Sequence, residues 1–486
     1  MSKKYKKPKS FDYNQVAIGA GAAGLVTTYI SAAVGAKSAL IDRHKMGGDC
    51  LNTGCVPSKA IIKSAKINHQ IKNAKKYGIN VKDTEVDFKA VMTRIHSVIK
   101  DIEPHDSVER YTKLGVECIS GEAKILSPWE IEVNGKILTT KNITIATGAR
   151  PFVPPIPGIK NINLATSDSL WEITELPKRL LVVGGGPIGS ELAQAFSRLG
   201  SAVTQVERND RIMAREDESI SELIQSSFKE EGINLLLKSN LVKFEKSNDE
   251  NIAFIESEGE TKEISFDLCI MAIGRKANTT GFGLEELGVE LNPSGTVKVD
   301  PYLRTTKYKN IYACGDVAGP FQFTHTAAHQ AWYVAVNSLF KPFYKKKANY
   351  DVVPRVTFTD PEVASVGLSE VEAKNSNTKY LKTIYPLDDL DRAIAESETK
   401  GFVQVLTKPG TDKILGATIV GSHAGDMLLE FTSAMKNGFG LNGIMGTIHP
   451  YPTLGEGNKY VAGFWKNKTK PEKIIAWLKK FHAFRR

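Results

Sequence analysis

The sequence contains few cysteines, no long apolar run and no secretory signal, and each absence excludes a class of protein. Five cysteines among 486 residues are too few for a small disulfide-stabilised secreted fold. No apolar run reaches the roughly 18 residues of a membrane-spanning helix. The N-terminal residues carry charge but lack the apolar stretch of a signal peptide. We therefore expect a globular protein of the cytoplasm.

The body of the chain also lacks a basic surface, although the formal net charge is +10. Residues 1–9 contribute +5 through Lys3, Lys4, Lys6, Lys7 and Lys9. Residues 466–486 contribute +7, because eight Lys or Arg face only Glu472. Residues 10–465 are therefore near −2, and we expect no nucleic-acid partner.

The C-terminal end has a mixed basic and apolar pattern. Ile474, Trp477 and Phe481 interleave with Lys473, Lys479 and other cations. This pattern fits two arrangements: a last helix packed on its own domain, or a basic amphipathic helix that makes peripheral contact with an anionic membrane.

Two glycine-rich turns each follow a short apolar segment and precede a helical one. The first has Gly19, Gly21 and Gly24 after an expected strand at 14–18, with Asp42 closing the next strand. The second has Gly184, Gly186 and Gly189 after an expected strand at 180–183, with a helix from near Ser190 and Glu207 closing the strand 202–206. Such glycines let a pyrophosphate approach the helix N-terminus, and the acid accepts from a ribose. The repeat predicts two nucleotide sites.

Three further turns follow apolar segments. They contain Thr147 and Gly148, Gly274, and Gly315 with Asp316, and a helix is expected from near Thr324. Residues 341–350 are expected to form a linker. From Val352 onward, alternating strands and two amphipathic helical stretches predict a separate α+β domain.

Cys50 and Cys55 form the only closely spaced cysteine pair. A regular helix would hold their Cα atoms about 8.6 Å apart, whereas a disulfide needs less than about 7 Å. Gly54 and Pro57 lie where the helix can break and bring them together. A zinc site is disfavoured because only His44 and Asp49 lie nearby as ligands. A bridge in poor geometry is easily reduced, so we expect a redox centre.

Together these motifs, from about Tyr13 to Tyr460, resemble the flavin-dependent pyridine nucleotide–disulfide oxidoreductases, of the mercuric reductase and dihydrolipoamide dehydrogenase type. The resemblance implies an α/β fold with two Rossmann-like doubly wound nucleotide-binding domains and a C-terminal α+β dimerisation domain. The expected segments are 1–175 and 306–350 for FAD, 176–305 for NAD(P), and 351–486 for a homodimer interface.

The resemblance also implies roles for individual residues. FAD would be held by the first glycine turn with Asp42, Thr147, Gly148, Gly315 and Asp316. NADH or NADPH would be held by the second turn with Glu207 and Gly274. NADH is favoured, because Glu207 accepts hydrogen bonds from the ribose hydroxyls and repels a 2′-phosphate. The positive charge of the adjacent Arg208 would weaken this repulsion.

The same resemblance assigns the redox chemistry. A hydride would pass from NAD(P)H to the flavin, which opens the Cys50–Cys55 bridge. Cys55 would be the flavin-proximal thiolate and Cys50 the interchange thiol. Lys59 and Glu191 would form an ion pair beside the flavin. His325 and His329, on the helix that starts near Thr324, are expected either to contact the flavin or a substrate, or to lie on the helix surface.

The chain departs from the disulfide-reducing members of the family at the C-terminal base. Aligning Pro452, Thr453 and Glu456 places Tyr451 where those members carry the histidine that shuttles a proton with the glutamate. A phenol, whose pKa is ~10, is a poor proton shuttle at neutral pH. Reduction of a metal ion needs no proton shuttle. The sequence therefore favours a mercuric reductase-like enzyme with a metal-ion or small-molecule acceptor, although it lacks that enzyme's C-terminal cysteine pair.

Two alternatives stay open. If His449 acts as a displaced base, the chain is a dihydrolipoamide dehydrogenase or another disulfide reductase; otherwise His449 is bonded to backbone in a turn. A slow-turnover flavin redox sensor is the alternative from a different class.

Overall fold

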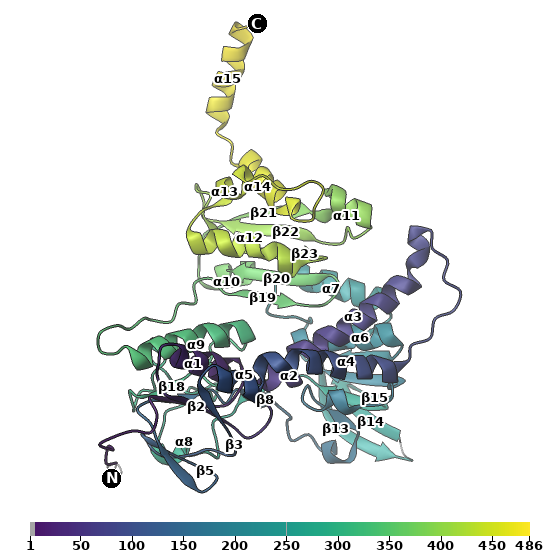
Figure 1. Cartoon of the computed structure of the whole chain (residues 1–486). Helices are drawn as coiled ribbons and strands as arrows, with labels where there is room; N and C mark the ends of the chain where they lie inside the picture. Colours follow the sequence, from purple (N-terminus) through teal and green to yellow (C-terminus); the bar gives the residue numbers. More distant parts are fainter. Residues whose placement is uncertain (1–4, 249) are drawn as a thin grey trace. The chain divides into compact units, whose positions relative to one another are not determined.

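The structure is a computed structural model that describes residues 5–248 and 250–486, so Lys3 and Lys4 of the N-terminal basic segment lie outside the described residues. Contacts group the chain into two units (Figure 1). The first unit comprises the chain up to Arg208 together with Ser239–Asn349, and the second comprises Asn209–Lys238 and Tyr350–Arg486. The division into four segments made from the sequence remains a prediction.

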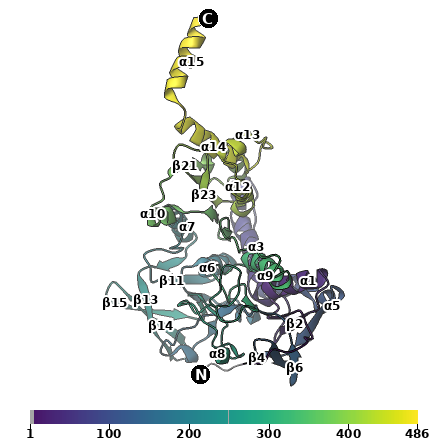
Figure 2. The same ribbon diagram turned by 90° about the vertical axis from the view of Figure 1, so that its left-hand side faces the viewer.

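The first unit contains a parallel sheet with the strand order β18-β7-β1-β2-β3. Its strands are β1 (Gln15–Ile18), β2 (Ser38–Asp42), β3 (Val116–Ser120), β7 (Ile143–Ile145) and β18 (Ile311–Ala313). All four residues of β1 are buried, as parallel sheets require. The helices α1 (Ala22–Ala33) and α9 (Thr324–Leu339) lie side by side against this sheet (Figures 1 and 2). The predicted strand–turn–helix context of the first glycine turn is confirmed.

A second parallel sheet of the same unit runs β11-β10-β16-β9. Its strands are β9 (Leu164–Ala165), β10 (Arg179–Val183), β11 (Ala202–Val206) and β16 (Leu268–Met271). The helix after the second glycine turn, α6 (Pro187–Leu199), begins three residues before the predicted Ser190. Proline is favoured at the first helical position, because its missing N–H would have no partner there. Both predicted nucleotide-binding folds are therefore present.

The first unit is completed by antiparallel strands and by helices around the sheets. The antiparallel groups are β4 (Lys124–Ser127), β5 (Glu130–Val133) and β6 (Lys136–Thr139); β13 (Ser239–Ser247), β14 (Glu250–Ser257) and β15 (Glu260–Phe266); and β8 (Ala149–Pro151) with β17 (Arg275–Ala277). The further α-helices are α2 (Gly48–Asn52), α3 (Cys55–Lys72), α4 (Phe88–Ile102), α5 (Val108–Lys113) and α8 (Leu284–Leu287). The helix α3 packs between α4 and α6, which fixes the direction in which its first turn points.

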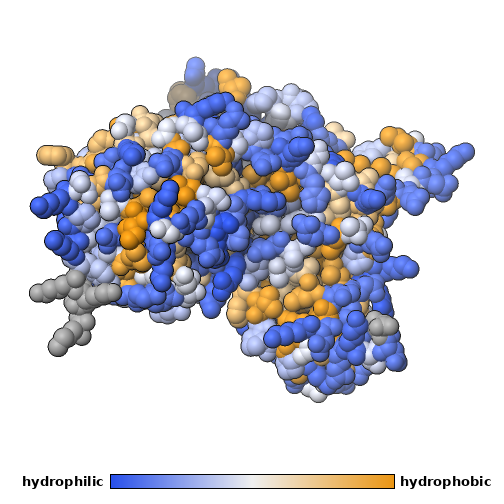
Figure 3. Space-filling model, turned by 60° about the horizontal axis from the view of Figure 1, so that its bottom comes forward, coloured by the Kyte–Doolittle hydropathy of each residue, from blue (hydrophilic) through white to orange (hydrophobic). Residues whose placement is uncertain are grey.

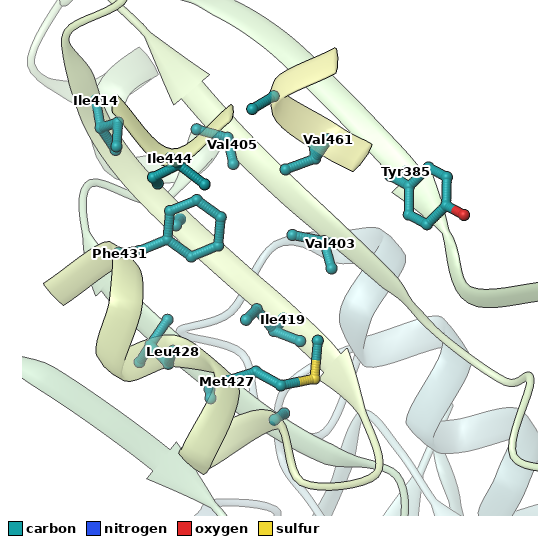
Figure 4. Packing of buried hydrophobic residues seen from close by; sticks show 14 of the residues in the cluster. Tyr385, Val403, Val405, Ile414, Ile419, Met427, Leu428, Phe431, Ile444 and Val461 are labelled. Carbon is teal, nitrogen blue, oxygen red and sulfur yellow. The ribbon is translucent and has the colours of Figure 1, made fainter. Parts of the chain in front are cut away.

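The second unit is built on an antiparallel sheet with the order β19-β20-β23-β22-β21. Its strands are β19 (Pro354–Thr357), β20 (Glu362–Gly367), β21 (Leu381–Pro386), β22 (Phe402–Thr407) and β23 (Ile414–Gly421). The core lies between this sheet and its helices, where Phe431 packs among Val405, Ile419 and Ile444 (Figure 4). The unit also takes α7 (Glu218–Glu230) and β12 (Asn234–Leu236) from earlier in the chain.

The second unit has more helices than the two stretches predicted after Val352. They are α10 (Glu370–Asn375), α11 (Asp391–Glu396), α12 (Ala424–Asn437), α13 (Leu441–Gly446), α14 (Glu456–Lys468) and α15 (Glu472–Phe484). Three of them, α10, α11 and α13, have six residues each. A helix of that length is too short to show a 3.6-residue period in the sequence.

The exposed surface mixes polar and apolar residues. Figure 3 shows one face that is mostly hydrophilic, with apolar side chains gathered in separate patches. Within residues 5–248 and 250–486, no helix combines the length and the apolar character that crossing a bilayer requires.

Candidate active site

The two closely spaced cysteines lie on either side of a break between two helices. Cys50 lies in α2, and Cys55 is the first residue of α3. The Gly54 N–H donates to the Asp49 carbonyl at 2.5 Å, and a Cβ on Gly54 would lie 3.0 Å from that oxygen. Pro57 is tolerated because it falls in the first turn of α3. The predicted interruption between the cysteines is therefore confirmed.

All five cysteines are free thiols, and they differ in acidity. Burial raises the pKa of Cys269 and raises that of Cys314 to about 12. The Cys50 thiol is hydrogen-bonded to Cys55; this bond, followed by burial, raises the pKa of Cys50. The same bond, with help from the Thr324 hydroxyl and the Lys59 charge, lowers the pKa of Cys55 to about 6. Cys55 is thus the sulfur that ionises first, and the Cys50 thiol donates a hydrogen bond to its thiolate.

Two polar contacts define the surroundings of Cys55. Its Sγ lies 3.5 Å from the Thr324 hydroxyl, at the first residue of α9. One turn along α3, the Lys59 ammonium donates to Glu191 of α6 at 2.8 Å. The Glu191 side chain is only 7% exposed, so its charge needs this partner. The structure therefore brings the predicted residues Cys50, Cys55, Lys59 and Glu191 into one region.

Arg275, which no sequence motif indicates as a site residue, joins this region. The Arg275 guanidinium forms an ion pair with Asp49, donates to the Ala149 carbonyl at 2.8 Å, and lies 3.7 Å from Asp316. Burial raises the pKa of Asp316 to about 6, against the opposing effect of Arg275. Arg275 and Asp49 are 226 residues apart in the sequence. Only the fold brings Arg275 beside Asp49, the residue that precedes Cys50.

The first glycine turn has the geometry that a dinucleotide requires. A Cβ on Gly19 would strike the Ala146 carbonyl, and one on Gly24 would strike the Gly19 carbonyl. At Gly21 the nearest atom to such a Cβ is the Gly48 Cα at 3.9 Å, so the turn is open on this side. The outer glycines thus permit the turn and the helix packing, and the middle one leaves room for a pyrophosphate. The residues present fit FAD.

The second glycine turn repeats this arrangement. A Cβ on Gly184 would strike the Ala272 carbonyl, and one on Gly189 the Gly184 carbonyl, whereas one on Gly186 meets nothing within 4 Å. The two acids also occupy equivalent places. Asp42 accepts from the Ala20 N–H at 2.6 Å, and Glu207 accepts from the Gly185 N–H at 2.6 Å. Both carboxylates therefore lie against their turns, where a ribose would meet them, and the second turn fits a nicotinamide nucleotide.

The remaining predicted cofactor residues lie at the carboxyl ends of their strands. Thr147 and Gly148 are tied to Asn278: the Thr147 hydroxyl donates to the Asn278 carbonyl at 2.7 Å, and the Asn278 N–H donates to the Gly148 carbonyl at 3.0 Å. The Gly315 N–H donates to the Gln330 side chain at 2.6 Å. This edge is where open parallel sheets bind ligands. The sequence motifs did not indicate Asn278 or Gln330.

Gly274, with φ of 141°, lies in the connection from β16 to β17, and its carbonyl accepts from the Phe152 N–H at 2.9 Å. On α9, the His325 ring stacks on Phe323 with centroids 5.2 Å apart. The His329 ring bonds to the Asn349 carbonyl at 3.1 Å, and both histidines are exposed. Both rings therefore lie on the surface of α9, and their contact with the flavin or a substrate stays a prediction.

The C-terminal residues lie in the second unit. The Tyr451 phenol donates to Asp391 at 2.9 Å, and this bond raises its pKa above the ordinary value of 10.0. Glu456 is buried at the start of α14, where it accepts from the Thr453 N–H at 3.2 Å. These two predicted residues hold partners on their own unit.

His449 has acceptors at both ring nitrogens. Its Nδ1 lies 2.9 Å from the Thr447 carbonyl, and its Nε2 lies 3.0 Å from the Glu430 carboxylate. The Asn458 amide donates to the same carboxylate at 3.0 Å. The contact with the Thr447 carbonyl is the one expected of a histidine in a turn. Together with the contact to Glu430 it occupies both ring nitrogens, so neither is directed at a substrate in this arrangement.

Comparison with known proteins gives the chain a family. Residues 13–331 match the family described as "Pyridine nucleotide-disulphide oxidoreductase", and residues 353–462 match its dimerisation domain. The mercuric reductase of Bacillus cereus is 36% identical over 450 residues, which cover 93% of this chain and 71% of that protein. The dihydrolipoyl dehydrogenase of Chlamydia pneumoniae is 34% identical over 450 residues, which cover 92% and 95%.

A solved structure agrees with this result. The HOCl-induced flavoprotein disulfide reductase RclA from Escherichia coli superposes with a TM-score of 0.83 at 26% identity, covering 93% of this chain and 99% of that one. Its Cu(II) complex gives a TM-score of 0.82. The predicted resemblance and fold class are thus confirmed, and the matched dimerisation domain supports a homodimer. This chain belongs to the pyridine nucleotide–disulphide oxidoreductases, NAD(P)H-dependent flavoenzymes that bind FAD.

Proposed function

We propose that this enzyme reduces a thiophilic metal ion with electrons from a nicotinamide nucleotide, by way of the Cys50–Cys55 pair. Bound FAD would take a hydride equivalent from the nucleotide and pass two electrons to the disulfide. The proposal depends on one arrangement above all: the Cys55 sulfur is bonded to the Cys50 thiol and lies 3.5 Å from the Thr324 hydroxyl. These contacts, with the Lys59 charge, lower the pKa of Cys55 to about 6. Such a sulfur is an anion at neutral pH and binds soft metal ions.

The electron balance of the cysteine step is simple. Two electrons and one proton open the Cys50–Cys55 bond to a thiol on Cys50 and a thiolate on Cys55. When the bond re-forms, the proton is released and two electrons reach the acceptor. One Hg(II) would become Hg(0), or two Cu(II) would become two Cu(I). No leaving thiolate of a substrate has to be protonated.

Tyr451 supports a metal ion over a disulfide substrate. Its phenol has a raised pKa and donates to Asp391, so it stays protonated at neutral pH and takes up no proton. Both nitrogens of His449 have partners within the second unit. A disulfide substrate needs a base that shuttles protons near pH 7, and a metal ion does not.

The relatives support the same class of acceptor. The Bacillus cereus relative is named a mercuric reductase, and the Escherichia coli protein, which is named a disulfide reductase, binds Cu(II) in one of its structures. The dihydrolipoyl dehydrogenases at 34% identity make lipoamide the second candidate. We further propose NADH as the preferred nucleotide, because Glu207 lies at the turn that would hold the ribose. The proposed location is the cytoplasm, and membrane contact of residues 466–486 is a separate inference.

One experiment separates these candidates. The holoenzyme is reduced anaerobically with NADH and then offered Hg(II), Cu(II), quinones, lipoamide and glutathione disulfide in turn. Restored steady-state NADH oxidation with a metal ion, and not with lipoamide, supports the proposal. Turnover with lipoamide alone makes the enzyme a disulfide reductase. Stable reduction with no acceptor restoring turnover makes it a redox sensor.

A matched pair of variants tests the assignment of the two sulfurs. Contact between a thiolate and the flavin gives a long-wavelength absorbance band on reduction. We expect Cys55→Ser to abolish this band and Cys50→Ser to retain it. The opposite result would exchange the roles of the two cysteines.

A further inference from the structure

The last helix of the chain, α15, leaves its apolar side chains in water. None of its 13 residues is buried. Ile474 is 55% exposed, Trp477 61% and Phe484 90%. A helix of this length is marginal by itself in water, and large exposed apolar side chains gathered in one place mark an interaction site.

The apolar residues of α15 lie on one face. Successive residues of a helix are rotated by about 100°, so positions three, four, seven and ten apart share a face. Ile474, Trp477, Leu478, Phe481 and Phe484 follow this spacing. The Trp477 and Phe481 rings stack with centroids 5.5 Å apart, which joins them into one aromatic surface. Lys473, Lys479 and Lys480 project from the rest of the circumference.

The charge around this face has one sign. Residues 466–486 carry eight Lys or Arg and only Glu472 as an acid. Two copies of such a segment would repel each other, so the charge disfavours self-association through α15. A nucleic acid would satisfy the cations but leave the aromatic face in water. A surface that is both anionic and apolar, as the headgroup region of a bilayer is, satisfies both.

The position and length of α15 agree with a peripheral contact. The match to the dimerisation domain ends at residue 462, so α15 lies beyond the matched domain. Thirteen residues extend for only about 20 Å, which is too short to cross the roughly 30 Å hydrocarbon core. A helix of this kind lies in the plane of the interface.

We propose that α15 binds the surface of membranes that contain anionic phospholipid. The aromatic face, with Trp477 and Phe481 at its centre, enters the boundary between headgroups and acyl chains. Lys473, Lys479 and Lys480 stay at the level of the phosphates. The proposal is independent of which acceptor the enzyme reduces.

Vesicle sedimentation of the holoenzyme tests this proposal. Vesicles of phosphatidylcholine alone are compared with vesicles that also contain phosphatidylglycerol. Three variants are compared with the unmodified enzyme: Trp477→Ser with Phe481→Ser, the triple change of Lys473, Lys479 and Lys480 to Gln, and the control Ala476→Ser with Ala483→Ser. The control changes the same helix away from its aromatic face.

We expect binding to the anionic vesicles only. The triple Gln change should weaken it by about 100-fold, since each basic residue near an anionic surface contributes roughly tenfold or less. The aromatic change should abolish it, and the control should bind as the unmodified enzyme does. NADH oxidation in solution should be equal in all four proteins.

Two results would overturn the proposal. In the first, the unmodified enzyme does not sediment with the anionic vesicles, or the aromatic and Gln variants bind as well as the control. In the second, analytical ultracentrifugation finds that the aromatic change dissociates the dimer, which would make a second copy of the chain the partner of α15.

Discussion

The Lys59 ammonium of α3 and the Glu191 carboxylate of α6 meet at 2.8 Å, and the two charges act on Cys55 in opposite directions. The ammonium lowers the pKa of Cys55, and the carboxylate raises it. The pair therefore contributes to the charge of the redox centre, in addition to joining two helices.

Neutralising each partner should shift the pKa of Cys55 in a different direction. Lys59→Gln removes the favourable charge and should raise it, and Glu191→Gln removes the unfavourable charge and should lower it. The measurement is the pH dependence of iodoacetamide alkylation in a Cys50→Ser background, where the serine hydroxyl still donates. Lys63→Gln, at an exposed position one turn further along α3, is the control. Shifts of the same sign in both variants would contradict this account.

The reduced enzyme should change its spectrum near pH 6. Because the pKa of Cys55 is lowered to about 6, the thiolate forms as the pH rises through that value and is lost as the pH falls below it. The long-wavelength band of the NADH-reduced enzyme should follow the same curve. A band that stays constant between about pH 5 and 8 would show that Cys55 ionises below this range, which would contradict the prediction.

Asp316 should make the flavin-free protein less stable at neutral pH than at acid pH. Its pKa is raised from 3.8 to about 6 by burial, so the ionised form is disfavoured in the folded chain. The carboxyl is protonated in both states below about pH 4, and above about pH 6 its burial lowers the free energy of unfolding by about 3 kcal/mol. Asp316→Asn should remove this loss, as urea unfolding at pH 5 and pH 8 would show.

Asp300 is the matched control for that experiment. Its side chain lies 2.7 Å from Arg304, and hydrogen bonds with Arg304 outweigh burial and lower its pKa. Asp300→Asn should therefore reduce the stability above about pH 4, the opposite of the Asp316 variant. If both substitutions changed the free energy of unfolding by the same amount, the charge of Asp316 would be stabilised by its partners in spite of its burial.

The glycines of the second turn should separate folding from nucleotide binding. Gly186→Ala adds a methyl group that meets no atom within 4 Å, so thermal stability and FAD content should not change. The same methyl would occupy the place of the pyrophosphate, and KM for NADH should rise by on the order of tenfold. Gly189→Ala would strike the Gly184 carbonyl and should lower Tm instead. Loss of FAD from the Gly186 variant would contradict this division.

Glu207 should decide between the two nicotinamide nucleotides. Glu207→Gln removes the charge that repels a 2′-phosphate, and Arg208 then lies next to it in sequence. We expect kcat/KM for NADPH to rise by on the order of tenfold while that for NADH falls. The ratio of kcat/KM for NADH to kcat/KM for NADPH is also measured in the unmodified enzyme. A preference for NADPH there would make the proposed role of Glu207 wrong.

The sequence predicted the parts of the fold that depend on local chemistry. The two glycine turns, their acids and the break at Gly54 are all dictated by neighbouring residues, and each was found at the expected position. The predicted start of α6 near Ser190 is wrong by three residues, because Pro187 is the first helical residue. The short helices α10, α11 and α13 carry no period from which they could be recognised.

The long-range contacts of the site could not be predicted in this way. Arg275 reaches Asp49 across 226 residues, and Thr324 reaches Cys55 across 269. Neither contact leaves a mark in local spacing, since each depends on how β17 and α9 are placed by the sheets. The chemistry of His449 makes it a candidate base, but its partner Glu430 comes from α12, a helix that no sequence motif connects with it.

The break between α2 and α3 has a mechanical consequence. Cys50 lies on a helix of five residues, whose entry is fixed where the Gly47 N–H donates to the Ala20 carbonyl at 2.9 Å, whereas Cys55 begins a helix of 18 residues held on two sides. Making and breaking the sulfur–sulfur bond should therefore move the short helix α2 more than the long helix α3. The strands and helices that form the two nucleotide sites should then need little movement during a redox cycle.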